Sequence, residues 1–297
     1  MEREIDFLPP EQLLITSGEY SVCVAASLQI PSVLQEIGRL REVTFRNAGE
    51  GTGKAHDLDR HDDHYEHLFL WNQQKREIVG AYRIGRTDQI LPQRGIRALY
   101  TSSLFHLEPQ FYSAIEPALE LGRSFVRPEY QKHYLPLLML WKGLGHFVAA
   151  APRYRILLGP VSISNNYSPE SRALIVSFLK MRHRNQQLSG YVRPRHKFRI
   201  PNLPECHPSN FSCLLENLDE LSEVIADLES DHKGLPILLQ HYLNLGGQML
   251  EFSVDAKFSN VLDALVVVDL AQSNRRQLER YMGRDKAKEY LEYHGIR

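Results

Sequence analysis

The chain has 297 residues, of which 43% are hydrophobic and 24% are charged, and its formal net charge is -1. These values exclude a disordered chain, a collagen-like repeat and a small disulfide scaffold, and they give no overall field that attracts nucleic acid. The three cysteines, Cys23, Cys206 and Cys213, form no CxxC pair, and no secretory signal opens the chain. This pattern favours a reducing cytoplasm.

Hydrophobic periodicity predicts alternating helices and strands in the first half of the chain. The expected elements are a strand over 18–27, a helix over 33–46, a Gly-rich and then acidic loop over 47–67, a hairpin over 67–72 and 77–87, a helix over 108–116, a strand over 119–126 and an apolar helix over 135–150. The apolar run at 136–152 contains Lys142 and His146. It is too short and too polar to span a bilayer, so we expect a buried helix.

The second half continues the alternation and ends in helices. The expected elements are a strand over 155–164, a helix over 168–184, a basic stretch over 191–199, a Pro-rich connector over 200–210, helices over 216–230 and 236–250, a strand over 260–270 and a polar helical tail over 275–293. This order predicts an α/β layered sheet rather than a sandwich or a bundle.

Two loop segments contain residues typical of ligand sites, but neither has a specific spacing. GEGTGK (49–54) lacks a Ser or Thr after Lys54 and follows a helix, so a flexible loop is favoured over a phosphate site. The stretch 56–67 is rich in Asp and His, yet it has neither zincin nor EF-hand spacing. We therefore expect a solvated or ion-paired loop and no metal, with Arg39, Arg41, Arg46 and Arg83 as available partners.

The expected strand LELGRSFV (119–126) carries Glu120 and Arg123. In a regular strand Glu120 and Gly122 share one face and Arg123 lies on the other, unless a bulge changes its direction. A carboxylate on a central strand is costly to bury unless it is paired or functional. Considered alone, Glu120 is interpreted as a member of an ordinary ion pair.

Four segments in order resemble one family. They are LREVTFR (40–46), the pair Asp59 and Asp62, VGAYRIG (79–85) and ELGRSFV (120–126). This set resembles GNAT-fold N-acyltransferases of the ornithine-lipid synthase or haemolysin-like branch, which is related to acyl-homoserine-lactone autoinducer synthases. Segments such as LYTSSLF (99–105) and GPVSISNNYS (159–168) extend the resemblance over nearly the whole chain. Autoinducer synthases usually carry Ser where Gly122 stands, which favours the lipid branch.

The resemblance implies a GNAT-like mixed, mostly antiparallel sheet with splayed central strands flanked by helices. Residues 1–190 would form the acyltransferase core, and 191–297 would supply a basic linker, helices and a final strand that complete one continuous domain. The implied activity is transfer of a long-chain fatty acyl group from an acyl carrier protein thioester to the α-amine of an amino acid such as ornithine or glycine. No cofactor is permanently bound.

The resemblance also implies the donor and the partners. Acyl-CoA is the other candidate donor, but RPEYQKHYLP (127–136) has no glycine for a pyrophosphate-binding turn, which favours the carrier protein. Peripheral contact with the inner membrane face and a partner lysophospholipid acyltransferase are expected as well. Nucleic-acid binding through RPRHKFR (193–199) has little support, because few aromatic residues accompany these charges.

The site residues expected from the resemblance and from their chemistry fall into four groups. The catalytic cluster is Glu120, as general base, with Arg123, Arg41 and Arg83. The substrate contacts are Phe45, Asp59, Asp62, Leu121, Gly122 and Ser124, with backbone N–H groups of 121–124 around the oxyanion. The carrier-docking residues are Arg127, Lys132, His133, Arg153 and Arg155, for which exposed solubility charges are the alternative. The acyl tunnel would be walled by Leu137, Leu138, Leu140, Trp141 and Phe147, for which core packing is the alternative.

Two other functions stay open on the sequence. One is an acetyl-CoA-dependent N-acetyltransferase acting on a small molecule. The other is a non-catalytic GNAT module that binds a partner. Product formation with different thioesters would separate these interpretations.

Overall fold

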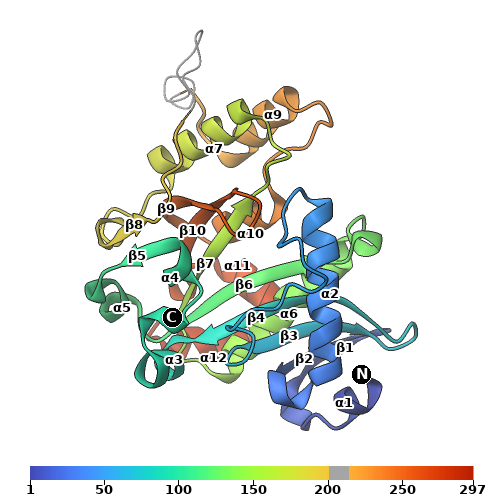
Figure 1. The fold of residues 1–297 in the computed structure, drawn as a ribbon. Helices are drawn as coiled ribbons and strands as arrows, with labels where there is room; N and C mark the ends of the chain where they lie inside the picture. Colours follow the sequence, from blue (N-terminus) through green and yellow to red (C-terminus); the bar gives the residue numbers. More distant parts are fainter. Residues whose placement is uncertain (201–213, 297) are drawn as a thin grey trace.

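One eight-stranded sheet organises the chain, in the strand order β1-β2-β3-β4-β6-β7-β10-β9 (Figure 1). The computed structural model describes residues 1–200 and 214–296, so Cys206, Cys213 and nearly all of the expected connector over 200–210 lie outside the described residues. The strands are β1 (Leu13–Ser17), β2 (Tyr20–Ala26), β3 (Glu66–Asn72), β4 (Glu77–Arg86), β6 (Ala118–Val126), β7 (Ile156–Ile163), β9 (Gln248–Asp255) and β10 (Val261–Asp269). A separate two-stranded sheet pairs β5 (Phe105–Leu107) with β8 (Val192–Pro194).

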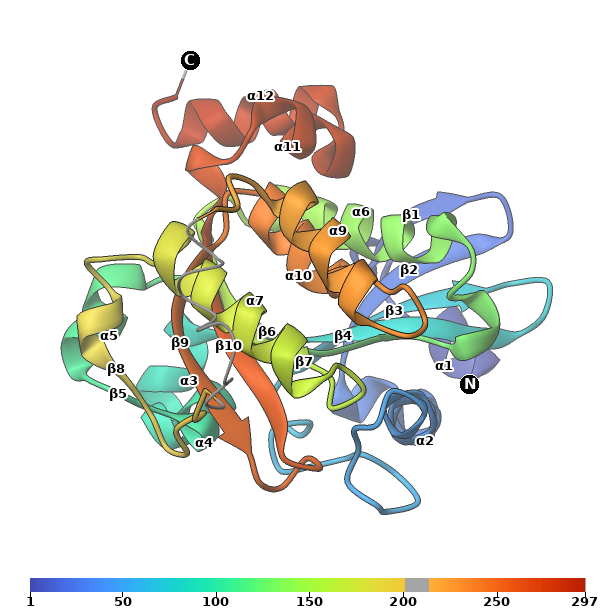
Figure 2. The ribbon, with the colours of Figure 1, turned by 90° about the horizontal axis from the view of Figure 1, so that it is seen from above.

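Helices cover both faces of the large sheet. In chain order they are α1 (Glu2–Asp6), α2 (Pro31–Asn47), α3 (Thr87–Arg94), α4 (Thr101–Leu104), α5 (Pro109–Ile115), α6 (Tyr134–Ala150), α7 (Pro169–Arg182), α9 (Leu218–Leu228), α10 (Ile237–Asn244), α11 (Arg275–Met282) and α12 (Arg284–Tyr293). Figure 2 shows α2 on one side of the sheet and α6, α10, α11 and α12 on the other. No helix in the described ranges is both long and apolar enough to cross a lipid bilayer.

The apolar patterns account for these layers. Helix α2 buries Val33, Ile37 and Leu40 against side chains such as Phe69 and Ala81 on one face of the sheet. The expected apolar helix is α6, which buries side chains such as Met139, Leu144 and Val148 in the main hydrophobic core. Helix α7 begins where the sequence indicated, because the Ser168 side chain accepts a hydrogen bond from the backbone N–H of Ser171.

The structure confirms the mixed α/β fold, and two of its differences from the expected elements depend on glycine. The helix expected over 236–250 ends at Asn244, and Gly246, with φ +87°, turns the chain into β9. Strand β1 was missed, and Gly18 at φ +58° closes its hairpin with β2. In both places glycine supplies a left-handed conformation that other residues adopt only at a cost.

The two central strands β6 and β7 separate toward their C-terminal ends. They form the one parallel pair among the described strands, and it extends only over 118–120 and 156–158. Beyond this point β6 pairs with β4, and β7 pairs with β10. The splayed central strands expected from the resemblance are therefore present.

Candidate active site

A β-bulge directs Arg123 and Ser124 into the space between the splayed strands. In the β4–β6 ladder Gly122 lies opposite Arg83 and Phe125 lies opposite Ala81, so two residues of β6 oppose Tyr82 alone. Arg123 adopts φ +49°, a left-handed conformation that is uncommon for a residue with a side chain. Such bulges change the direction of side chains next to functional sites. The sequence left the direction of the Arg123 side chain open, and the bulge turns it toward the space between β6 and β7.

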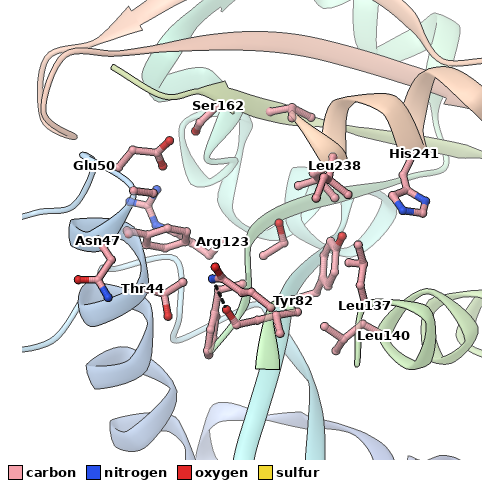
Figure 3. A pocket seen from close by; sticks show the side chains of 18 of the residues that line it. Thr44, Asn47, Glu50, Tyr82, Arg123, Leu137, Leu140, Ser162, Leu238 and His241 are labelled. Carbon is pink, nitrogen blue, oxygen red and sulfur yellow. Dashed lines mark hydrogen bonds between the residues drawn. The ribbon is translucent and has the colours of Figure 1, made fainter. Parts of the chain in front are cut away.

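A cavity of about 630 Å³ occupies the gap between β6 and β7 (Figure 3). One end is polar and contains Arg123 and Glu50, and the other end is mostly apolar. The lining residues used below are Thr44, Phe45, Glu50, Tyr82, Tyr100, Arg123, Ser124, Val126, Lys132, His133, Tyr134, Leu137, Leu140, Ser162, Ile237, Leu238, His241, Phe258 and Asp263. A space that is polar at one end and apolar along its length suits an amphiphilic molecule.

Behind the cavity, two buried arginines are held by the acidic loop that follows α2. Arg41 Nη1 donates to Asp62 at 2.7 Å, and Arg83 Nη1 donates to Asp59 at 2.8 Å. Arg83 also lies 3.3 Å from the second carboxylate oxygen of Asp62. Both arginine side chains are almost fully buried and neither lines the cavity. Their ion pairs therefore hold the loop in place behind the cavity.

The arginines of this network stabilise the ionised forms of its aspartates. Burial alone would raise the pKa of Asp62, but Arg41 and Arg83 hold it well below its usual range. The pKa of Asp59 is also lowered, because Arg83 and Arg123 outweigh its burial. Burial beside Arg41 lowers the pKa of His67 to about 4, so this histidine is neutral near pH 7.

Arg123 is held by an ion pair, a hydrogen bond and two aromatic rings. Its Nε lies 3.0 Å from Asp57, and its Nη1 donates to the Tyr100 hydroxyl at 3.0 Å. The rings of Tyr100 and Phe258 lie 4.9 Å and 4.4 Å from its guanidinium carbon. Asp59 is more distant, at 4.0 Å from Nη2. These contacts orient a cation at the cavity wall.

Glu120, which the sequence predicts to be the general base, lies in the interior of the protein. Its side chain is 1% exposed and does not line the cavity. One carboxylate oxygen accepts from the Tyr65 hydroxyl and the Tyr100 backbone N–H, and the other accepts from the Thr101 N–H at 2.5 Å. These bonds make Glu120 a positioning residue that holds the start of α4 and Tyr100.

The expected substrate contacts are divided between the cavity and the interior. Phe45 and Ser124 line the cavity, and the carboxylates of Asp59 and Asp62 hold arginines as described above. Leu121 is 2% exposed in the core, and Gly122 is paired with Arg83 in the sheet. Neither of these two lines the cavity.

Two of the five residues expected in the wall of the acyl tunnel line the cavity. Leu137 and Leu140 line the cavity, whereas Leu138, Trp141 and Phe147 do not. Trp141 packs among aromatic side chains, including Tyr242 and Tyr281, and Phe147 lies under the guanidinium of Arg86. Helix α10 supplies Ile237, Leu238 and His241 instead, which the sequence did not indicate.

The five expected docking residues do not form one patch. Arg153 and Arg155 follow the C-terminal end of the 17-residue helix α6, roughly 25 Å from its start. Arg153 is paired with Asp88, and Arg155 is paired with Asp269. At the other end, Lys132 and His133 line the cavity.

Arg127 also belongs to the N-terminal side of α6, but it is engaged by Glu77 and Glu129. Of the five expected docking residues, Lys132 and His133 are therefore the two that form a basic surface beside the cavity.

The GEGTGK loop binds a carboxylate of the chain itself. The backbone N–H groups of Thr52 and Gly53 donate to Glu42 at 3.0 and 2.9 Å, and the Thr52 hydroxyl donates at 2.7 Å. Donors that would hold a phosphate are thus used by Glu42. The loop also places Glu50 at the cavity.

Sequence reasoning missed Glu50, Tyr82, Tyr100 and Asp263 at the cavity wall. A signal existed for Asp263, because it is the single charged residue inside the apolar run VLDALVVV (261–268). A lone carboxylate in a buried strand is unusual without a partner or a function. Glu50 gave no such signal in a Gly-rich loop.

The chain is similar to several known proteins that transfer acyl groups. A family model described as an acetyltransferase (GNAT) domain matches residues 40–142. A glycine N(alpha)-acyltransferase of Bacteroides thetaiotaomicron is 32% identical over 261 residues, which cover 83% of this chain and 77% of that protein. An L-ornithine N(alpha)-acyltransferase of Rhodobacter capsulatus is 28% identical, over 83% of this chain and 89% of that protein. A solved CoA-dependent acyl-homoserine lactone synthase covers 92% of this chain and 88% of its own length, at 11% identity and a TM-score of 0.41.

Proposed function

Because the chain belongs to the GNAT-type family of amino-acid Nα-acyltransferases, we propose that it moves a long-chain fatty acyl group from a carrier-protein thioester to the α-amine of glycine or ornithine. The observation that supports this proposal most directly is the cavity between β6 and β7, with Arg123 at one end and aliphatic side chains at the other. It offers places for a carboxylate and for a hydrocarbon chain in one continuous space.

The splayed strands support the position of the donor. From Gly159 onward β7 is paired only with β10, so its edge toward β6 is open. An extended pantetheine arm can bind along such an edge as an added strand does. Backbone N–H groups of the β6 bulge would then be available to the oxyanion that forms when the thioester is attacked.

The apolar half of the cavity supports a long acyl chain. Val126, Leu137, Leu140 and Leu238 line this half, which comes from β6, α6 and α10. An acetyl group would leave these surfaces uncovered, and burial of each CH₂ group contributes about 0.8 kcal/mol. The lining therefore favours a fatty acyl donor over acetyl-CoA.

The start of α6 supports a carrier protein as the donor. Lys132 and His133 line the cavity immediately before this 17-residue helix, and a helix N-terminus attracts an anion. One phosphate of a carrier-bound pantetheine matches these groups. The turn contains no glycine for the closer backbone approach that a pyrophosphate needs.

The acceptor carboxylate is assigned to Arg123. It is the arginine of the cluster that lines the cavity, whereas Arg41 and Arg83 are paired with aspartates and do not line it. An arginine held by Asp57 and two aromatic rings presents a fixed edge, which suits recognition of a planar carboxylate.

Release of the product to a membrane surface is part of this proposal. Tyr134 and Ile237 line the cavity and are 51% and 64% exposed, so apolar side chains continue from the cavity to the surface. An N-acyl amino acid is an amphiphile, and such a border favours its passage into lipid.

The test is a product assay with paired donors and acceptors. Palmitoyl carrier protein, palmitoyl-CoA and acetyl-CoA are each incubated with glycine, ornithine, lysine or serine, and amides are identified by mass spectrometry. We expect palmitoyl amides of glycine or ornithine, formed fastest from the carrier protein. Turnover of acetyl-CoA alone would favour the small-molecule acetyltransferase. Absence of any amide would overturn the proposal and favour a non-catalytic module.

A further inference from the structure

Acidic groups exceed basic groups around the polar end of the cavity. The three arginines of the cluster are each ion-paired with aspartates of the loop that follows α2. Two further carboxylates, Glu50 and Asp263, line the cavity and are left outside these pairs. In the described ranges 1–200 and 214–296, no hydrogen bond or ion pair engages the Glu50 carboxylate, and Asp263 accepts only from the Ser162 hydroxyl, at 2.8 Å.

These two carboxylates approach the cavity from different elements. Glu50 lies on the loop after α2, and Figure 3 shows it beside Arg123 at the polar end of the cavity. Asp263 lies on β10, where it is 3% exposed. They are the only carboxylates that line this cavity within the part of the chain that the structure describes.

A second observation also points to a ligand in this space. The Thr44 hydroxyl on α2, which also lines the cavity, is buried and has no hydrogen-bond partner among the described residues. A buried polar atom without a partner costs about 1–3 kcal/mol, which a polar ligand would offset. An ionised carboxylate that is buried without a partner is costly as well, so Glu50 and Asp263 favour a cationic ligand in this space.

We propose that Glu50 and Asp263 bind the ammonium of the acceptor amino acid and take up the proton that the ammonium must lose before it attacks the thioester. This inference rests on the proposed function and adds the acceptor-amine site to it. With Arg123 on the carboxylate, the pair completes a site for a zwitterion. Each charge of the acceptor then meets an opposite charge of the chain.

The proton balance of the step is complete. The ammonium transfers one proton to a carboxylate of the pair, and the neutral nitrogen forms a bond with the thioester carbon. When the tetrahedral intermediate collapses, the C–S bond breaks and the sulfur leaves as a thiolate. A second proton from the nitrogen converts the thiolate into a thiol. The products are the amide, the free thiol of the carrier and one proton, which the carboxylate pair releases to solvent.

The ionisation of the pair agrees with this role. Burial and the nearby Asp263 raise the pKa of Glu50 to about 8, against the lowering effect of Arg123. Burial and Asp255 raise the pKa of Asp263 to about 7, although Ser162 and Arg123 lower it. A base with a pKa near the working pH is efficient.

The other charged groups around Glu50 do not act as its partner. On α2, Glu42 and Arg46 pair with each other at 2.7 Å, and Lys132 and His133 line the cavity from the α6 side.

The decisive experiment compares Glu50→Gln and Asp263→Asn with Glu289→Gln, which replaces an exposed carboxylate on α12. Steady-state rates are measured against acceptor concentration from pH 6 to 10. For Glu50→Gln we expect kcat/KM at pH 7.5 to fall about 10²-fold or more, since positioned bases contribute 10²–10⁴-fold. The KM for the acceptor should rise as well. The difference in kcat/KM between Glu50→Gln and the wild-type protein should diminish at high pH, because the free amine is already neutral there.

A merely structural role would not change the pH profile in this way. Glu50 lies on a loop, so Glu50→Gln is expected to keep the melting temperature of the parent protein, and this variant carries the test if Asp263→Asn does not fold. If wild-type protein forms amide and Glu50→Gln matches Glu289→Gln at every pH, the inference is wrong. If wild-type protein forms no amide, the proposed function fails instead.

Discussion

The Nε atom of Arg123 lies 3.0 Å from a carboxylate oxygen of Asp57, and this contact joins the β6 bulge to the loop that follows α2. Asp57 is 2% exposed, and its backbone N–H donates to the carbonyl oxygen of Gly38 on α2. The position of Arg123 therefore depends on how α2 packs against the sheet. An interior contact thus orients the cation that faces the cavity.

Arg123→Lys is expected to weaken acceptor binding while the protein stays folded. Lysine keeps the charge but has no planar fork, so it loses either the contact with Asp57 or the contact with the ligand. Hydrogen bonds to charged groups contribute about 1.5–3 kcal/mol, which predicts a rise of roughly 10- to 100-fold in the acceptor KM. Initial rates at saturating donor measure this effect.

Arg127→Lys is the matched control, because Arg127 directly follows β6 but does not line the cavity and pairs with Glu77 and Glu129. An unchanged acceptor KM in Arg123→Lys would contradict the assignment of the carboxylate to Arg123.

Asp62→Asn is expected to be among the most destabilising polar substitutions in the site. The change leaves Arg41 with a neutral partner and removes one of the two carboxylates near Arg83. Breaking a buried ion pair costs about 3–5 kcal/mol, because an uncompensated charge remains in the interior. Urea unfolding measures the loss. Asp63→Asn, at the adjacent exposed position, should change the free energy of unfolding by less than about 0.5 kcal/mol.

The same network predicts how the free energy of unfolding falls at acidic pH. The pKa values of Asp59 and Asp62 are lower in the folded protein than their ordinary value of 3.8. Their contribution is therefore fully present above about pH 4 and is lost as the pH falls below it. Unfolding measured from pH 6 to pH 2.5 should show this loss in the wild-type protein and a weaker one in Asp62→Asn. If the free energy of unfolding depends on pH in the same way in both proteins, Asp62 is not the cause of the loss.

Much of the fold followed from periodicity, because long apolar patterns such as that of α6 specify one element. Strand β9 was not anticipated, since its apolar start continues the pattern of α10 and only Leu245, Gly246 and Gly247 separate the two. The arginine–aspartate network was anticipated from the ordered family segments. Which arginine lines the cavity was not anticipated, because this depends on a bulge that no local pattern in β6 indicates.

Glu120→Gln is expected to act on structure rather than on proton transfer. Both oxygens of Glu120 accept hydrogen bonds, so an amide group there must point N–H toward a donor, either the Tyr65 hydroxyl or a backbone N–H. Each unsatisfied group costs about 1–3 kcal/mol. We expect a lower melting temperature, some loss of activity through Tyr100, and an unchanged pH profile. A folded variant whose loss of activity follows pH would instead make Glu120 the base, with Glu289→Gln as control.

Gly159→Ala is expected to disturb the point where β6 and β7 diverge. A Cβ at Gly159 would lie 2.2 Å from the carbonyl oxygen of Leu121, so one of the strands has to move. Overpacking of this kind costs about 1–3 kcal/mol. Gly190→Ala is the matched control, because a Cβ there meets no atom within 4 Å. Equal stability of the two variants in thermal unfolding would show that the strands do not need this close approach.

Leu238→Trp is expected to shorten the acyl chain that the enzyme prefers. Leu238 projects from α10 into the apolar half of the cavity, as Figure 3 shows, so a larger side chain takes space from the hydrocarbon. Rates with C16 thioesters should fall while rates with C8 thioesters are retained, because each excluded CH₂ forfeits about 0.8 kcal/mol of burial. The measurement is kcat/KM across a chain-length series of carrier-protein thioesters.

Leu228→Trp provides the matched control, since Leu228 is 48% exposed at the end of α9 and does not line the cavity. It should keep the wild-type preference. If both variants decline equally at every chain length, the acyl group does not occupy the space beneath α10. If only Leu238→Trp shifts its optimum toward shorter chains, helix α10 sets the depth of the acyl site.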